Sequence, residues 1–292
     1  MKRIILSLAL LLPLVSSAQQ HHEFGFSAGI SSYYGDLQPD LFPDNSTNAM
    51  GGIMYKYFMN PHVGLRFGVS YTALSAFDTL SGIPAREERN LSFKSNLLEF
   101  HGGFEFNLLP IEKDRIKFTP YVFGGIAVFR FNPYTFGSQG QKVYLRPLGT
   151  EGQNIPLYPD RKEYKLVSTA FPVGGGLKFF LGKTFMITPE IGFRYTNTDY
   201  IDDVSKSYVN MNTLKEYRGQ TAVDYSFRTD ERAGWDGNYP DYRYQRGDSK
   251  SNDLYWFGNL TVTVYLENLA NMRHYWQTNS PAFLRSGRTQ YE

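Results

Sequence analysis

The sequence has no cysteine among its 292 residues. This absence excludes disulfide bonds, thiol catalysis and metal sites built on cysteine ligands. It also lacks an excess of charge of one sign. The formal net charge is +2 and falls to 0 when Lys2 and Arg3 are left out. A neutral chain gives no electrostatic reason to bind nucleic acid, so we expect no nucleic acid partner.

Long hydrophobic runs are also absent after the N-terminus. Residues 1–18 read as a signal peptide, with Lys2 and Arg3 before the apolar stretch Ile4–Val15 and small residues at 16–18. The apolar stretch is too short to span a bilayer, and no later run reaches eighteen residues. We therefore expect export, cleavage before Gln19, and membrane insertion by strands if the chain enters a membrane.

What the chain does have is alternation with a period of two. Between His62 and Thr72, every second residue is apolar, and the residues between them are polar or glycine. This pattern predicts a strand with one apolar face. Tyr and Phe are abundant, at 22 and 23 residues against 3 Trp. Such rings are typical of strands and of the boundary between membrane and water.

Eight such strands can be placed along the chain. They are predicted at Glu23–Tyr34, Asn48–Met59, His62–Thr72, a strand that ends through Leu98–Leu108, Thr119–Phe131, Val167–Leu181, Phe185–Tyr195 and Leu254–Leu266. The connections after the second, fourth and sixth strands are short, and those after the odd-numbered strands are long. Short periplasmic turns and long extracellular loops are typical of bacterial outer-membrane barrels. We expect an all-β, eight-stranded antiparallel transmembrane β-barrel over residues 19–266, with both termini in the periplasm.

A soluble barrel of the lipocalin type also has eight antiparallel strands. Two features favour the membrane barrel, in which the apolar face meets lipid. The polar face carries too few charges for a solvated surface, and those charges balance, four of each sign. Buried charges need partners. We predict a charge network inside the barrel, formed by Glu23, Lys56, Arg66, Glu99, Glu105, Lys178, Glu190 and Arg194.

The sequence offers little chemistry. Glu99 and His101 lie on one strand face and can be considered an acid–base or metal pair, but we interpret them as part of the interior network. The acidic run 199–203 lacks the spacing of an EF-hand, and we expect a solvated loop turn there rather than a calcium site. No nucleophile motif is recognisable. We expect no enzyme activity, no cofactor and no metal.

Five segments resemble the PorG-type outer-membrane β-barrel family of the type IX secretion system. They stand in family order and comprise Gly29–Leu37 (with Gly35, Asp36 and Leu37), Pro120–Pro133, Pro147–Gln153 (with Gly149, Thr150, Glu151 and Gly152), Thr198–Asn210 (with Asp199, Asp202 and Asp203) and Arg246–Phe257 (with Arg246 and Gly247). Residues 211–245 and the end of the chain do not match the family pattern.

The resemblance implies a non-enzymatic component of protein secretion and gliding machinery, which associates with periplasmic ring subunits. A general structural or adhesion barrel, which binds extracellular ligands through its long loops, is the alternative. A membrane-embedded enzyme would need an activity that depends on His101 or Glu99.

The segment 267–292 is expected to be a periplasmic tail. It mixes aromatic and arginine side chains, which often dominate protein interfaces. We predict a partner contact through this tail and the turn Leu109–Lys117, with Arg273, Tyr275, Trp276, Phe283, Arg285 and Arg288 as the candidate residues. The alternative is a disordered, solvated tail, as is common at chain ends.

Overall fold

The computed structural model describes residues 21–110, 118–182 and 184–266. The expected signal peptide 1–18 lies outside the described residues. So do residues 111–117 of the turn and the tail 267–292, with all six of its candidate contact residues.

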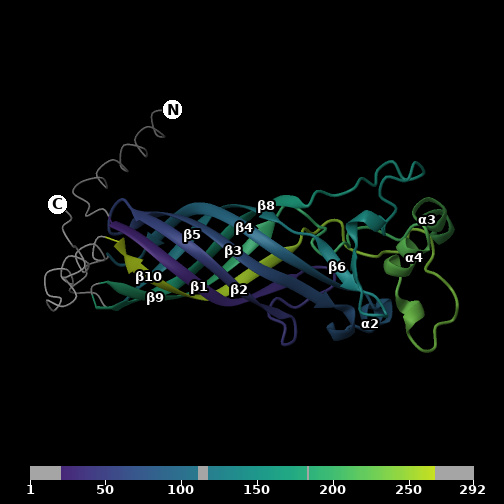
Figure 1. Ribbon diagram of the computed structural model, residues 1–292, viewed down its shortest axis with the longest axis horizontal. Helices are drawn as coiled ribbons and strands as arrows, with labels where there is room; N and C mark the ends of the chain where they lie inside the picture. Colours follow the sequence, from purple (N-terminus) through teal and green to yellow (C-terminus); the bar gives the residue numbers. More distant parts are fainter. Residues whose placement is uncertain (1–20, 111–117, 183, 267–292) are drawn as a thin grey trace, which may run out of the picture.

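Eight long strands close into one antiparallel barrel (Figure 1). Around the barrel the order is β3-β2-β1-β10-β9-β8-β5-β4, and pairing of β4 with β3 completes the circle. The eight-stranded antiparallel barrel predicted from the alternation is confirmed. The strands are β1 (His21–Tyr34), β2 (Thr47–Phe58), β3 (Val63–Phe77), β4 (Ser92–Asn107), β5 (Phe118–Arg130), β8 (Val167–Leu181), β9 (Phe185–Thr196) and β10 (Leu254–Tyr265).

The outer wall of the barrel is apolar, as the alternation predicts. Outward-facing side chains remain well exposed in the isolated chain, including Phe26 at 62%, Phe104 at 61% and Ile126 at 59%. In water this continuous apolar surface would be unfavourable, whereas lipid tails would cover it. The wall is therefore organised as in a transmembrane barrel, with apolar residues outside and polar residues inside.

Strand β5 is apolar on both faces because its inner face carries aromatic rings. Tyr121, Phe123 and Phe129 are buried inside the barrel, while Val122 and Ile126 point outward. Gly125 lies opposite Gly103 of β4. A Cβ atom at Gly103 would lie 2.2 Å from the Gly124 carbonyl oxygen, so only glycine permits this close approach of the two strands.

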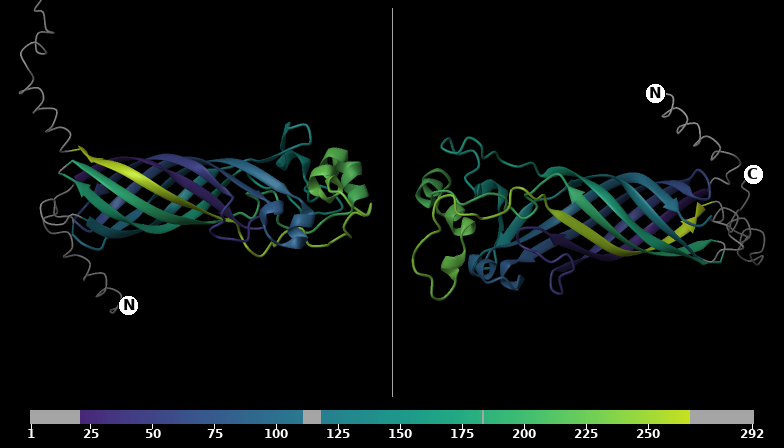
Figure 2. Two further views of the ribbon diagram at one scale, coloured as in Figure 1. Left: turned by 90° about the horizontal axis from the view of Figure 1, so that it is seen from below. Right: turned by 180° about the vertical axis from the view of Figure 1, so that it is seen from behind.

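The long loops gather at one end of the barrel and fold into a cap (Figure 2). We define the cap as residues 35–46, 78–91, 131–166 and 197–253. It contains a hairpin of β6 (Pro133–Phe136) and β7 (Lys142–Tyr144), in which β6 extends the sheet beside β4. Its helices are α2 (Pro84–Arg89), α3 (Met211–Arg218) and α4 (Gln220–Ser226), with short 3₁₀ turns at Asp78–Leu80, Arg146–Leu148 and Thr229–Glu231.

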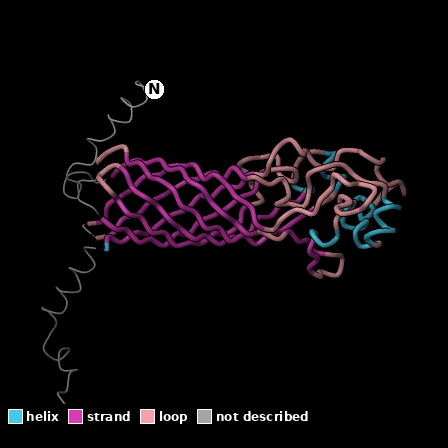
Figure 3. Tube along the Cα trace, turned by 90° about the horizontal axis from the view of Figure 1, so that it is seen from above, coloured by secondary structure: helices cyan, strands magenta, loops and turns pink. Residues whose placement is uncertain are grey.

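The cap has its own buried core, apart from the barrel interior. The N-terminus of α3 is fixed by the Asn210 side chain, which accepts hydrogen bonds from the backbone of Asn212 and Thr213. Helices α3 and α4 bury their apolar faces in one cluster, composed of Ile155, Tyr158, Tyr208, Val209, Met211, Leu214, Ala222, Val223 and Phe227. Figure 3 shows this loop-rich body beyond the strands of the barrel. No helix in the described ranges is long and apolar enough to cross a membrane.

One expected lipid-facing residue is covered by the cap instead. Trp256 shares the outward alternation of Leu260 and Val262, yet it is only 5% exposed. The loop 35–46 folds over it: the Trp256 Nε1–H donates to the Leu41 carbonyl at 2.6 Å, and the Phe42 ring lies 5.3 Å away. At this outward position a loop distant in sequence covers the strand, which the alternation alone does not show.

We predict that an outward charge destabilises the barrel according to its depth. Ile126→Arg lies near the middle of β5 and should cost about 2–4 kcal/mol when the barrel is folded into phospholipid vesicles. Leu181→Arg, at the end of β8, is the matched control and should cost about 0–1 kcal/mol. Urea unfolding in vesicles measures both values. Equal small costs at the two positions would contradict a lipid-facing wall.

Candidate functional site: the barrel interior and the loop cap

The eight charged residues predicted for the interior all lie inside the barrel, and none is more than 6% exposed. Glu105 is the centre of one group. Its carboxylate pairs with Lys56 Nζ at 2.7 Å, with Lys178, and with Arg66 Nη1 at 3.5 Å. Three cations from β2, β8 and β3 therefore meet one acid from β4 across the barrel axis.

Two further acids complete the network. Arg66 also pairs with Glu190 at 3.0 Å, and Glu190 accepts a 2.6 Å hydrogen bond from the Tyr121 hydroxyl. Glu99 pairs with Arg194 at 3.3 Å and accepts from the Tyr255 hydroxyl at 2.6 Å.

Several members of the interior are residues that sequence reasoning missed. His21 lies 3.0 Å from Glu23, and the hydroxyls of Tyr121 and Tyr255 each hold a glutamate. Cations also stack on aromatic rings, with the Arg66 guanidinium 3.7 Å from the centre of the Phe123 ring. The inward aromatics of β5 were visible in the sequence as a second apolar face, but their partners were not.

Glu99 and His101 lie side by side, with His101 Nδ1 3.0 Å from a Glu99 oxygen. Both side chains are enclosed, and Glu99 is already held by Arg194 and Tyr255. Within residues 21–110, 118–182 and 184–266, no group of three or more acids and histidines is arranged to hold a metal ion. The pair therefore belongs to the interior charge network.

In the cap, segments far apart in the sequence meet at buried Arg246. Its Nη1 pairs with Glu151 at 3.1 Å and donates to the Asp203 carbonyl at 2.7 Å. One Glu151 oxygen also accepts from the backbone of Ser205 and Lys206, each at 2.9 Å. The Thr150 hydroxyl donates to Asp203 at 2.5 Å. Three of the five segments that carry the family resemblance thus share one polar core.

A fourth segment joins through Asp36. Both of its carboxylate oxygens lie 3.0 Å from the Asp248 backbone nitrogen, and the neighbouring Leu37 is fully buried. Gly247 is next to this contact and donates to the Lys206 carbonyl at 2.7 Å. Gly149 and Gly152 shape the turn around Thr150 with φ angles of +62° and +77°, which favour glycine.

The acidic run 199–203 is not the solvated turn that the sequence suggested. Asp199, Asp202 and Asp203 are 9%, 1% and 0% exposed. The Tyr33 hydroxyl lies 2.7 Å from both Asp202 Oδ2 and Asp253 Oδ1 and accepts from the Asp36 backbone. A phenol has one proton to donate, so the second short contact needs a proton on one of the two carboxyls.

Burial raises the pKa of these acids, as that geometry requires. The pKa values of Asp202 and Asp253 lie well above their ordinary range because both are buried, and because the charge of Asp36 acts on Asp202 and the charge of Asp202 acts on Asp253. Burial raises the pKa of Asp199 to about 8 and that of Asp203 to about 6, the latter against the opposing effect of Arg246.

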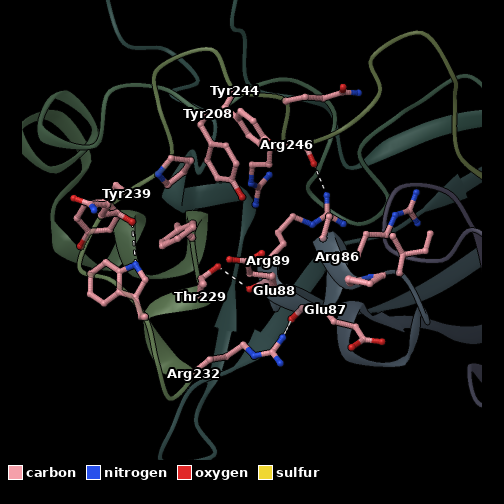
Figure 4. A pocket seen from close by; sticks show the side chains of 18 of the residues that line it. Arg86, Glu87, Glu88, Arg89, Tyr208, Thr229, Arg232, Tyr239, Tyr244 and Arg246 are labelled. Atoms are coloured by element: carbon pink, nitrogen blue, oxygen red, sulfur yellow. Dashed lines mark hydrogen bonds between the residues drawn. The ribbon is translucent and has the colours of Figure 1, made fainter.

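A cavity of about 1320 Å³ opens in the cap beside α2 (Figure 4). Its walls combine arginines and acids with aromatic rings. Trp235 and Phe227 lie 5.6 Å from Tyr239 by ring centres. The labelled lining residues are Arg86, Glu87, Glu88, Arg89, Tyr208, Thr229, Arg232, Tyr239, Tyr244 and Arg246. Much of this wall comes from residues 211–245.

We predict that removing one interior cation leaves an acid uncompensated. Arg66→Leu should destabilise the barrel by about 3–5 kcal/mol, because Glu190 keeps only Tyr121 as its partner. Adding Glu190→Gln should recover a large part of that loss, and Glu190→Gln alone is the control. Unfolding in detergent or vesicles measures all three. A loss below half a kcal/mol for Arg66→Leu would indicate that water screens the interior.

We also predict that the cap is more stable in acid than in base. The pKa of Asp199 is raised on folding, so the folded cap binds more protons than the unfolded one, and its stability falls between about pH 4 and about pH 8. Asp199→Asn should reduce this decline, whereas Asp44→Asn, on the exposed loop 35–46, should not. Urea unfolding of the cap, followed by tryptophan fluorescence at pH 5, 7 and 9, is the test. Stability that rises with pH would contradict the buried acid cluster.

Comparison with solved structures gives low overall similarity to bacterial barrels. The N-terminal β-barrel domain of Pseudomonas aeruginosa OprF is 12% identical, with 85% of this chain and 99% of that chain covered and a TM-score of 0.33. Neisserial surface protein A is 10% identical, with coverage of 83% and 95% and a TM-score of 0.39. Pseudomonas aeruginosa OprG is 9% identical, with coverage of 85% and 95% and a TM-score of 0.36.

A search of curated proteins gives no match. A family model described as a domain of unknown function, DUF6089, matches residues 2–221. This match spans most of the chain, from the N-terminus through all the barrel strands except β10. The chain belongs to the DUF6089 family.

Proposed function

We propose that this protein is a non-enzymatic outer-membrane barrel of a type IX-like protein secretion and gliding machinery, which associates with periplasmic ring subunits. The observation that carries the proposal is the convergence of the segments that resemble PorG-type proteins. Arg246, Glu151, Asp203 and Asp36 come from four of these segments and meet in one buried cap core. Because these residues contact one another in the folded cap, their joint resemblance to PorG-type proteins is better explained by a shared cap structure than by chance similarity of short motifs.

In this proposal the apolar wall lies in the outer membrane and the short turns face the periplasm. The first and last strands support this orientation, because Glu23 of β1 pairs with Tyr265 of β10 at the end opposite the cap. The segments that precede β1 and follow β10 would then share the compartment of the ring subunits. The cap would face the outside of the cell.

The filled interior argues for a scaffolding role rather than conduction. Glu105 with its three cations fills the interior toward the barrel end opposite the cap, and the rings of Tyr121, Phe123 and Tyr255 fill further space along the barrel. Eight strands leave an interior that side chains fill. Neither a folded cargo protein nor a large solute has a path through it, so the proposed contribution to secretion is by contact with partners.

The test is co-purification from the native cell envelope after gentle detergent extraction. Ring subunits should be recovered with the tagged full chain, and a deletion strain should lose export of type IX cargo. Truncation after Leu266 should leave a heat-modifiable barrel but reduce ring recovery. If the full chain never retains ring subunits and its deletion leaves export intact, the proposal fails.

Ligand binding outside the cell is the second candidate, and the cap cavity is the observation that favours it. Large, partly exposed rings such as Tyr239 and Tyr244, together with Arg232, are residues that often dominate contacts with partners. Replacing Trp235 and Tyr239 by alanine should then abolish binding to host or glycan surfaces and leave export unaffected. The secretion proposal predicts no effect of this pair of substitutions on surface binding, so the binding assay separates the two candidates.

A further inference from the structure

A second, smaller hollow lies on the outer wall, where the barrel meets the cap. Arg130 ends β5 and continues the outward alternation of Ile126 and Val128, which are 59% and 45% exposed. The Arg130 side chain is exposed, and no hydrogen bond or ion pair joins it to another residue in the described ranges. A cation therefore stands at the last outward position of a strand that is otherwise apolar on this face.

A second cation reaches the same hollow from the β6–β7 hairpin. Lys142 Nζ lies 3.6 Å from the centre of the Tyr134 ring and 4.8 Å from that of Tyr144. In the part of the chain that the structure describes, no carboxylate pairs with this ammonium group. The two aromatic rings hold the Lys142 side chain against the wall, and they leave its charge without a counterion.

The hollow has a volume of about 230 Å³ and an uneven lining. Tyr71 and Leu98 supply apolar surface on the barrel side, while Arg130 and Lys142 supply positive charge, with amides from Asn96 and Asn132 beside them. No Asp or Glu is among its lining residues. The charges of Arg130 and Lys142 are thus uncompensated at the edge of the apolar wall.

We propose that this hollow binds the phosphate-bearing headgroup of a membrane lipid. The site combines what such an amphiphile needs: an apolar wall for acyl chains, and two cations with amide donors at the depth where headgroups begin. Arginine and lysine at this boundary bind anionic headgroups, and hydrogen bonds to phosphate are charge-assisted. The inference rests on the membrane placement in the proposed function but does not involve ring subunits.

The test is native mass spectrometry of the purified full-length barrel in mild detergent, titrated with lipid A as the phosphate-bearing probe. We expect retained lipid A, and apparent affinity at least about tenfold weaker for Arg130→Gln with Lys142→Gln. Arg243→Gln with Lys250→Gln is the matched control, because both residues are exposed in the cap away from the hollow. Heat-modifiability on gels shows that each variant is folded, and the two single substitutions serve if the double variant does not fold.

Two further binding measurements use the unmodified protein. Dephosphorylated lipid A should be retained much more weakly than lipid A, and inorganic phosphate at millimolar concentration should not displace bound lipid A. Equal retention of the two lipids, or unchanged binding by the folded double variant, would overturn the inference. Displacement by inorganic phosphate would identify a site for soluble phosphate and overturn the lipid assignment. None of these results depends on ring co-purification, so the proposed function is tested separately.

Discussion

Compensation of charge inside a closed barrel is the constraint on which this structure depends. Glu105 is completely enclosed, and a carboxylate without a partner there would be strongly unfavourable. Lys56, Lys178 and Arg66 each come from a different strand to reach it. A slip of any of these strands by one residue would turn its charges toward the apolar outer face. The network therefore favours the observed strand register as well as compensating the buried charges.

In the cap, the negative charge of the buried acids is compensated in a different way. Arg246 compensates Glu151 and Asp203, but the group around Tyr33 has more carboxyl groups than cations in contact with it. Protons take the place of the missing positive charge, and the raised pKa values of Asp199, Asp202 and Asp253 are the consequence. The barrel thus compensates its buried acids by ion pairing, whereas the cap compensates the acids around Tyr33 by protonation. Their stabilities should respond differently to pH.

The barrel and the cap support different candidate functions. Side chains fill the interior of the barrel, which is why we propose that the protein acts by contact at its surfaces. The cap offers a cavity with aromatic and arginine side chains, and the outer wall offers a cationic hollow around Arg130 and Lys142. The membership in DUF6089 covers most of the cap-forming loops but ends at residue 221, before the Trp235–Tyr244 wall of the cavity.

The sequence by itself determined the barrel, because a strand shows its two faces in a local period of two residues. The strand count, the short and long connections and the eight inward charges all follow from that period, and Arg66 or Glu190 needed no partner in view to be assigned to the interior. Only the tertiary structure decided which charges meet, since the three cations lie 39 to 73 residues from Glu105 in the sequence, each on a separate strand. Burial of Asp199–Asp203 and covering of Trp256 by Phe42 were likewise hidden from the sequence. Loop residues have no period, and what covers them comes from distant segments.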